Sequence, residues 1–294
     1  MKSQIAGVEF NRPIPVRHYG RWIITMLLIA LALVTARSIA VNPNFHWDVV
    51  GEYLFNPQIL SGIGWTLALT VVAMAVSILL AATLVVMRSS GNPVMASISW
   101  LWVWFFRGTP VYTQLVFWGL LAVLYPRMSL NLPIFGEVFS APTKDLFTPA
   151  MAALVGLAFN EAAYLAEIFR AGFKAVDQGQ TEAAEALGMR RMKVMFRIII
   201  PQAMRMIIPP TGNETIGMLK TTSLVLAVPF AYDLTFAANT VANRLYMPVP
   251  LLVVAGIWYL TITSVLMWGQ YHLERHFGRG TDRSVSTAAP EKTT

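Results

Sequence analysis

The sequence contains no cysteine and few charged residues. Because none of its 294 residues is a cysteine, disulfide bonds and thiolate chemistry are excluded. Charged residues make up 13% of the chain, about half of the ~25% that is typical of soluble domains. The four histidines are scattered singly and predict no metal site. These shortages argue against a soluble domain and against a disulfide-stabilised or metal-dependent protein.

The sequence also lacks the motifs of an ATPase or of a covalent catalyst. No stretch matches G-x-x-x-x-G-K-[ST], the phosphate-binding loop of many ATPases. If ATP drives this protein, the ATPase is therefore a separate chain. No nucleophile or metal cluster emerges from the pattern, which argues against a membrane-embedded enzyme. The net charge is +7, but the placement of the cations indicates a membrane rather than nucleic acid.

Long hydrophobic runs are what the sequence does have. Hydrophobic residues make up 56% of the chain, and a membrane-spanning helix needs ~20 consecutive apolar residues. Spans in lipid must be helical, because a helix satisfies its own backbone polar groups. The pattern therefore predicts an all-α polytopic membrane protein with about six transmembrane helices. The candidate spans are Trp22–Val41, Ile63–Met87, Val111–Tyr125, Ala150–Ala171, Ile198–Leu219 and Leu251–Met267.

The cations are distributed unevenly between the two sides of these spans. If the N-terminus is cytoplasmic, most Lys and Arg residues fall on the cytoplasmic side, including Arg88, Arg107 and the basic run at 190–197. The opposite side receives only a few cations, which are Arg127, Lys144 and Arg244. This asymmetry is the positive-inside signal, and it predicts that both termini are cytoplasmic.

The ends of the chain differ in composition from its centre. Residues 1–21 predict a basic cytoplasmic N-terminus, and 22–41 a retained transmembrane helix, since the apolar run is too long for a cleaved signal peptide. The stretch from Arg127 to Pro149 is predicted to be an external loop. Residues 279–294 are rich in Ser, Thr, Ala and Pro and predict a disordered cytoplasmic tail.

A short polar helix is predicted in the cytoplasm, in the stretch QGQTEAAEALGMRRMKVMFRIII at 178–200. Thr181 is a candidate N-cap, Glu182 and Glu185 would occupy the first turn, and Gly188 suits a left-handed C-terminal cap. Such a helix of about two turns is too short to be stable alone in water and must lie against another surface. The basic, Met-containing segment after Gly188 is predicted to lie at the lipid headgroups.

The segment EAAEALG at 182–188 closely resembles the EAA loop of ATP-binding-cassette (ABC) importer permeases. Further segments resemble the polar amino-acid branch of that family. They are FRGTPVYTQL at 106–115, AAYLAEIFRAGF at 162–173 and NETIGMLKTTSL at 213–224. The resemblance covers roughly Ser61 to His272. The four motifs occur together and in the family's order, which is far more specific than any one motif alone.

The resemblance implies a type I importer permease whose transmembrane domain covers 61–272, with the helix at 22–41 added before a five-helix core. The EAA loop at 178–200 would dock in a cytoplasmic ABC ATPase dimer, which binds ATP and Mg, so this chain needs no cofactor of its own. The implied docking residues are Glu182, Ala183, Ala184, Glu185 and Gly188. An external solute-binding protein would deliver a polar amino acid, and a second permease subunit, identical or related, would complete the pathway in a bacterial cytoplasmic membrane.

Ionisable residues inside spans are costly and usually face the interior of the helix bundle. Glu167 and Arg170 lie three residues apart and can pair on one helix face. We interpret them as a structural pair rather than as transport residues.

Polar residues in two spans are candidates for the solute pathway. A free amino acid carries an ammonium, which carboxylates attract, and a carboxylate, which cations, hydroxyls and exposed backbone N–H groups attract. Pro209–Pro210 is expected to weaken the helix that carries one group of candidates. Glu214 and Lys220 could instead only brace neighbouring helices. The acidic candidates favour a cationic or zwitterionic solute. The candidates are Asn160, Glu161, Asn213, Glu214, Lys220, Thr221, Thr222 and Ser223.

A secondary transporter driven by an ion gradient is the alternative function. It would need no partner ATPase, and the EAA helix would then have no purpose. A P-loop protein bound at the cytoplasmic face would distinguish the importer from this alternative.

Overall fold

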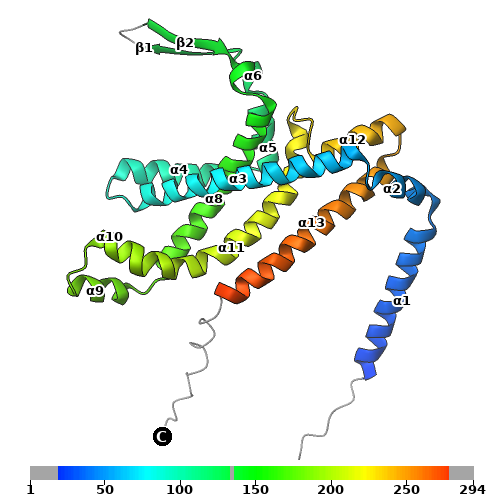
Figure 1. The fold of residues 1–294 in the computed structure, drawn as a ribbon, viewed down its shortest axis with the longest axis horizontal. Coiled ribbons are helices and arrows are strands. Elements are labelled where there is room, and N and C mark those ends of the chain that lie inside the picture. The colour runs from blue at the N-terminus through cyan, green and yellow to red at the C-terminus, as the bar shows by residue number, and fades with distance from the viewer. Residues whose placement is uncertain (1–18, 133–135, 278–294) are drawn as a thin grey trace, which may run out of the picture. The chain divides into compact units, whose positions relative to one another are not determined.

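The computed structural model describes residues 19–132 and 136–277 (Figure 1). Most of the predicted basic N-terminus and the whole tail predicted at 279–294 lie outside these described residues. The chain divides into two compact units, Met1–Trp47 and Asp48–Thr294.

The first unit consists mainly of α1, Tyr19–Val41, followed by a short 3₁₀ helix, Pro43–Phe45. None of the α1 side chains is buried. A helix that is apolar on every side suits a lipid environment. It coincides with the span predicted at 22–41 and begins three residues earlier. The indole Nε1 of Trp47 donates a hydrogen bond of 3.1 Å to the Ile39 carbonyl, which closes the end of the helix.

The second unit is a bundle of long helices with short connecting helices and one two-stranded ribbon (Figure 1). Its elements are α2 Trp47–Tyr53, α3 Pro57–Ser89, α4 Pro93–Gly108, α5 Val111–Gly119, α6 Leu121–Leu124, β1 Arg127–Leu132, β2 Gly136–Pro142, α7 Thr143–Leu146, α8 Pro149–Lys174, α9 Gln178–Ala186, α10 Arg191–Val194, a π-helical turn Met195–Ile199, α11 Ile200–Thr221, a 3₁₀ segment Thr222–Ala227, α12 Leu234–Leu245 and α13 Pro248–Phe277.

The long helices begin at sequence signals that act locally. Asn56 and Asn92 each precede a proline, and their side chains accept hydrogen bonds from the second helical residue, at 2.9 Å in both cases. Thr148 also caps α8 before Pro149, but its hydroxyl accepts from the third helical residue, Met151, at 3.4 Å. An oxygen-bearing side chain at the N-cap followed by proline is a favourable helix start, because proline lacks only an N–H that the helix leaves unpaired.

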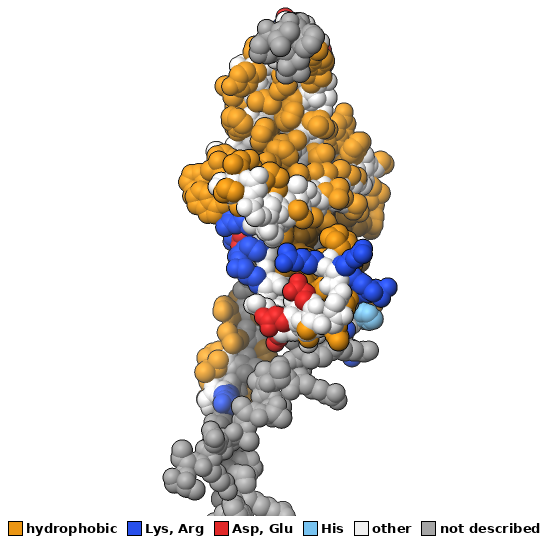
Figure 2. Space-filling model, turned by 90° about the vertical axis from the view of Figure 1, so that its left-hand side faces the viewer, with side chains coloured by type: hydrophobic (Ala, Val, Ile, Leu, Met, Phe, Trp, Pro, Cys, Tyr) orange, Lys and Arg blue, Asp and Glu red, His pale blue; other side chains and the backbone are white. Residues whose placement is uncertain are grey.

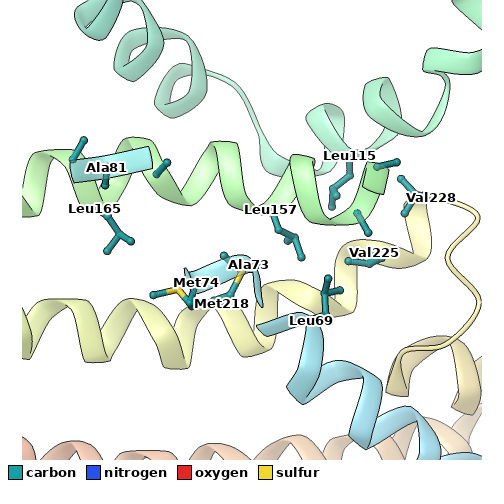
Figure 3. Close-up of a cluster of buried hydrophobic side chains, with 14 of the residues drawn as sticks. Leu69, Ala73, Met74, Ala81, Leu115, Leu157, Leu165, Met218, Val225 and Val228 are labelled. Atoms are coloured by element: carbon teal, nitrogen blue, oxygen red, sulfur yellow. The ribbon is translucent and has the colours of Figure 1, made fainter. Parts of the chain in front are cut away.

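The main hydrophobic core lies around α8, which packs against α3, α4, α5 and α11 (Figure 3). Leu157 and Leu165 of α8 are fully buried among side chains of these helices. Small residues let the backbones approach closely, as is common between helices in membranes. The Ser77 hydroxyl of α3 donates to the Ala158 carbonyl of α8 at 3.2 Å. A Cβ at Gly172 would stand 2.3 Å from Ile207 of α11.

A second hydrophobic cluster joins α12 and α13 to the beginning of α3. Ile59, Leu234, Val241, Leu251 and Val254 are fully buried in it. The backbone N–H of Leu234 donates to the Thr66 hydroxyl at 3.0 Å, which fixes the start of α12 against α3. No pattern in the sequence predicted α12.

The structure has four helices that are long and apolar enough to span a membrane, namely α1, α3, α8 and α13, within the described part of the chain. They correspond to four of the predicted spans. The predicted span at 198–219 corresponds to α11, whose Arg205, Asn213 and Glu214 make it too polar to count among them. The number of crossings therefore stays a prediction.

The predicted span Val111–Tyr125 is wrong as a single helix. That stretch forms α5 and α6, which are nine and four residues long. The preceding aromatic segment forms α4, which lies alongside α3 (Figure 1), where the Ser99 hydroxyl donates to the Leu84 carbonyl at 2.8 Å. α4 and α5 thus both pack beside α8, and the chain breaks between them at Thr109–Pro110, where proline cannot continue the helix of α4.

The predicted external loop between Arg127 and Pro149 contains more structure than expected. β1 and β2 pair as an antiparallel ribbon, with Arg127 opposite Pro142. The Arg127 guanidinium donates to the Ser140 hydroxyl across the ribbon at 3.1 Å. The chain is nevertheless predominantly helical, and this ribbon is its only sheet within the described residues.

Candidate functional site

α9 is the helix predicted in the EAA segment, but it begins earlier than expected. Its N-cap is Asp177, whose side-chain oxygen accepts a hydrogen bond of 2.6 Å from the Gly179 N–H. The prediction that Thr181 caps the helix is wrong, because Asp177 satisfies the first N–H groups and Thr181 lies inside the helix. Glu182 and Glu185 therefore occupy the middle and the last turn of α9, not its first turn.

The C-terminal end of α9 is closed by Gly188, which has a positive φ of 76°. The Gly188 N–H donates to the Glu185 carbonyl at 2.9 Å, and the Met189 N–H donates to the Ala184 carbonyl at 3.1 Å. These two bonds form a Schellman motif, which satisfies carbonyls that the helix end leaves free. A side chain at residue 188 would meet open space, so it is the backbone conformation that favours glycine here.

α9 presents most of its side chains outward. Ala184 is its one buried residue and packs toward α10 and the π-helical turn. Glu182, Ala183 and Glu185 are exposed, and Leu187 at the end of the helix is 84% exposed. Arg191 forms an ion pair with Glu185 at 3.6 Å, which contributes little because both groups are in solvent. An exposed, thin, two-turn helix is suited to insertion into a cleft of another protein.

The segment after α9 connects it to α11. α10, the π-helical turn and α11 follow one another without a loop, and Val194 of α10 is buried. Figure 2 shows Lys and Arg side chains gathered near acidic ones on the face that carries α9 and α10, below a broad hydrophobic surface. A displacement of α9 would therefore act on the beginning of α11 through a short helical connection.

α11 continues through Pro209 and Pro210, so the expected weakening does not break the helix. The side-chain amide of Gln270, on α13, donates to the Pro209 carbonyl at 2.8 Å and to Glu274 at 2.8 Å. A Cβ at Gly212 would stand 1.8 Å from the Gln270 amide oxygen. Gln270 therefore packs directly on the proline region of α11, a contact that no pattern in the sequence predicted.

A cavity of about 480 Å³ lies between the FRGTP motif, the middle of α8 and the second half of α11. Side chains that can bind a polar solute are contributed by all three segments. The polar side chains that line it belong to Arg107, Thr109, Asn160, Glu161, Tyr164, Glu214 and Thr221. Cavities of several hundred Å³ with a few convergent polar groups are typical of small-molecule sites.

Arg107 and its neighbours are held in place by α8. The Asn160 side-chain amide donates to the Phe106 carbonyl at 2.8 Å, which fixes the end of α4 against the middle of α8. The Arg107 guanidinium lies 5.2 Å from the centre of the Tyr164 ring, a cation–π contact. Arg107 was predicted only to fall on the cytoplasmic side of the spans. It lines the cavity because α4 continues beside α3 as far as the level of Asn160.

Two carboxylates face the same cavity from different helices. Glu161 of α8 is buried, and its Oε1 has no hydrogen-bond partner among the described residues. Glu214 of α11 is partly exposed and lines the same cavity. A buried carboxylate without a partner is costly unless a cation or a hydrogen-bond donor joins it. The arrangement therefore favours a cationic ligand near Glu161 and Glu214, with Arg107 available to an anionic group.

The other predicted pathway residues lie outside this cavity. Asn213 and Lys220 are exposed on α11. The Thr222 hydroxyl donates to the Leu219 carbonyl at 2.6 Å, and the Ser223 hydroxyl donates to the Lys220 carbonyl at 2.7 Å. Those two hydroxyls satisfy their own helix end. The structure brings together Asn160, Glu161, Glu214 and Thr221 and adds Arg107 and Tyr164, which lie in or beside the quoted motifs.

Glu167 and Arg170 form the pair that their spacing suggested. The Arg170 guanidinium donates to Glu167 Oε2 through Nε at 3.0 Å and also through Nη2. Both residues line a second cavity, of about 570 Å³, which also includes Arg88 and Arg107. The two cavities share Arg107, Gly108 and Tyr164.

Comparison with known proteins decides the family. Residues 92–279 match the family described as binding-protein-dependent transport system inner membrane component. The chain belongs to this family of ABC transporter permeases. The match includes the FRGTP motif, α8, α9 and α11, so both the cavity and the EAA segment lie within the family region. The family is a transport component rather than a catalyst.

Relatives of this chain within the permease family are named as amino-acid transporters. The arginine transport system permease protein ArgU of Corynebacterium glutamicum is 48% identical over 92% of this chain and 84% of its own. The octopine transport system permease protein OccM of Rhizobium meliloti is 36% identical over 76% of this chain and 85% of its own. A solved structure described as an amino acid ABC transporter with histidines is 33% identical, with a TM-score of 0.62, over 76% of this chain and 95% of the other.

Proposed function

We propose that this chain is the permease subunit of a bacterial ABC importer for a cationic amino acid, with arginine as the first solute to test. The observation that carries the proposal is the cavity in which Glu161, Glu214 and Arg107 meet. The arginine permease relative supports the same solute class. The cytoplasmic membrane is the proposed location, in agreement with the inner-membrane description of the family.

The charges of the cavity are complementary to those of a basic amino acid. Such a solute carries two cationic groups and one carboxylate, and the cavity offers two carboxylates and one guanidinium. Glu161 is placed to bind the more buried cationic group, since its Oε1 has no partner in the described chain. Arg107 is placed to bind the solute carboxylate through charge-assisted hydrogen bonds. An acidic amino acid would bring a second carboxylate close to Glu161 and Glu214 and would be repelled.

The partners follow from the same proposal. α9 would dock in a cleft of a cytoplasmic ABC ATPase dimer through Glu182, Ala183, Glu185 and Gly188, while Ala184 packs against the chain itself. The ATPase would hold ATP and Mg. A solute-binding protein would deliver the amino acid from outside, as the family's description suggests. A second permease subunit, identical or related, would complete the pathway, and both termini would be cytoplasmic.

The test is uptake into proteoliposomes that contain the permease, its ATPase and its solute-binding protein. We expect ATP-dependent uptake of arginine, weaker uptake of glutamine and none of glutamate. Uptake that proceeds without the ATPase and follows an ion gradient would establish the secondary-transporter alternative instead. Preferred uptake of glutamate would contradict the assignment of the solute class.

A topology test is independent of the solute. A reporter at the turn after Arg88 should be accessible only from the cytoplasm, and a reporter near Lys144 only from outside. The turn after Arg88 and α9 must lie on the same side, because α9 follows the end of α8 that packs beside the end of α3. An external reporter signal after Arg88 would contradict the predicted orientation and the proposed docking of α9.

A further inference from the structure

The second cavity collects more positive than negative charge. Arg88 of α3, Arg107 of α4 and Arg170 of α8 line it, and Glu167 is its one carboxylate. Arg170 donates to Glu167, and the charges of Arg88 and Arg107 also act on that carboxylate. Within the described chain, no carboxylate lies at ion-pair distance from Arg88 or Arg107. The lining therefore carries a net charge of about +2, from three arginines and one glutamate.

This cavity lies toward the end of the bundle at which α3 and α8 finish. Arg88 is in the last turn of α3, and Arg170 is four residues before the end of α8, about 6 Å along the helix axis. That level corresponds to the boundary between hydrocarbon and headgroups if these helices span a bilayer. Arginines at this boundary, on the side from which α9 projects, are placed to meet lipid phosphates.

An aromatic pair stands at the rim of the cavity. Trp100 and Trp104 of α4 line it, and their rings are stacked with centroids 6.2 Å apart. Both are more than half exposed, and Leu101 and Phe105 extend the same exposed apolar surface. Tryptophan favours the membrane interface, where one part of the ring is apolar and the N–H can reach a polar group. Acyl chains could lie on this surface while a phosphate occupies the guanidinium cavity.

We propose that the second cavity binds the phosphate headgroup of an anionic phospholipid from the leaflet that faces α9, through Arg88 and Arg170, while Arg107, which both cavities share, stays available to the solute carboxylate. This site goes beyond the proposed transport function, because it requires a bilayer and not a particular solute. A cationic solute is a poor occupant, since the lining is positive and its one carboxylate is already bonded to Arg170. The exposed tryptophan pair favours a ligand with an acyl chain over a free anion.

The experiment uses the permease–ATPase complex in phosphatidylcholine nanodiscs with a rising fraction of phosphatidylglycerol brominated on its acyl chains. Bromine quenches nearby tryptophan fluorescence. The chain has nine tryptophans, so the variant with both Trp100→Phe and Trp104→Phe supplies the background to subtract. We expect the Trp100–Trp104 signal to be quenched at a lower fraction of brominated phosphatidylglycerol than of brominated phosphatidylcholine.

Arg88→Gln should reduce this preference about tenfold, the loss typical of one charge-assisted hydrogen bond. Lys174→Gln is the matched control, because Lys174 is an exposed cation in the last turn of α8 that does not line the cavity. It should leave the preference unchanged. If Arg88→Gln does not assemble, Arg88→Lys is measured instead, and it should keep the charge-dependent preference in part.

Several outcomes would overturn the lipid site. Equal quenching by the two brominated lipids would show that the cavity does not prefer the anionic headgroup of phosphatidylglycerol over the zwitterionic headgroup of phosphatidylcholine. Equal losses in Arg88→Gln and Lys174→Gln would indicate general surface attraction. Relief of quenching by millimolar inorganic phosphate would indicate a site for soluble anions. Relief by arginine would assign the cavity to the solute pathway. A failure of arginine uptake alone would leave the lipid result intact and contradict only the proposed function.

Discussion

α9 and the central cavity are built from different kinds of information. α9 is nine residues long, and its two ends are fixed by neighbours in the sequence, namely Asp177 at one end and Gly188 at the other. The cavity draws Arg107, Glu161 and Glu214 from three segments that are far apart in the chain and that meet only after α4, α8 and α11 pack. A local change can therefore weaken α9, the proposed coupling element, whereas the cavity depends on the helix packing as a whole.

The largest expected effect is at Gly188. Gly188→Arg places a side chain at a φ of 76°, where a non-glycine residue has an energetic cost on the order of 1 kcal/mol, and adds a charged group beside the exposed Leu187. We expect normal membrane levels, loss of co-purified ATPase and loss of ATP-driven uptake. Pull-down of the ATPase together with vesicle uptake measures this.

Gly188→Asn is the matched control for this change, because asparagine tolerates the left-handed conformation better than other side chains. It should retain most ATPase binding. If Gly188→Arg kept wild-type ATPase binding and uptake, α9 would not be the coupling element. A coupling site built by local sequence alone would then be contradicted.

The second expected effect concerns the cavity. Glu161→Gln removes the buried carboxylate and should raise the KM for arginine at least tenfold, since a charge-assisted hydrogen bond contributes about 1.5–3 kcal/mol. Binding of the ATPase through α9 should not change. Lys220→Gln on α11 is the matched control, because Lys220 is exposed and does not line the cavity. An equal rise of KM in both variants would indicate a general effect of charge rather than a solute contact.

Features fixed by neighbouring residues could be predicted from the sequence, whereas features that depend on helix packing could not. The apolar runs predicted the existence of α1, α3, α8 and α13, because hydrophobicity acts within a few residues, but α3 begins before the predicted span and α13 continues past it to Phe277. Gly188 was identifiable as a cap because helix caps also act within a few residues. Arg107 was predicted only to lie on the cytoplasmic side, because a single cation near a hydrophobic run is ordinarily a sign of the membrane edge. Only the packing of α4 along α3 places it beside Asn160.

Other features could not be predicted because competing local signals were present. Both Asp177 and Thr181 are good N-cap residues, and the chain uses the earlier one. In the ribbon, β1 is RMSLNL and alternates polar and apolar residues as a strand does, but β2 is GEVFSAP and does not, so the pairing of the two strands has no complete local signal. Gln270 contacts Pro209 across helices α11 and α13, and no spacing within either helix indicates it.

A third prediction tests this contact between α11 and α13. Gly212→Ala would place a Cβ 1.8 Å from the Gln270 amide oxygen, so Gln270 must move and its bond to the Pro209 carbonyl is lost. That oxygen is the far end of a flexible side chain, so the cost is mainly that of the lost hydrogen bond, and we expect a loss of stability of about 1.5 kcal/mol, measured by thermal unfolding of the purified complex. Gly269→Ala on α13 is the control, since its Cβ would meet open space. Similar melting temperatures for both variants would contradict the close contact.

The smallest expected effect distinguishes the two candidate caps of α9. Asp177 accepts the Gly179 N–H, so Asp177→Ala should destabilise the helix by about 1 kcal/mol, whereas Thr181→Ala should have little effect because Thr181 is inside the helix. Hydrogen exchange of the α9 amides in the purified permease measures this, and the expected change is about a fivefold loss of protection in Asp177→Ala alone. Binding of the ATPase should protect α9 and reduce the difference, since docking stabilises the helical form by mass action.

A larger effect from Thr181→Ala would place the start of α9 at residue 181 after all and would move Glu182 and Glu185 back into its first turn. The docking surface would then include the positive end of the helix. Glu182→Lys, which reverses a charge at that end, would then reduce ATPase binding more than Asp177→Ala.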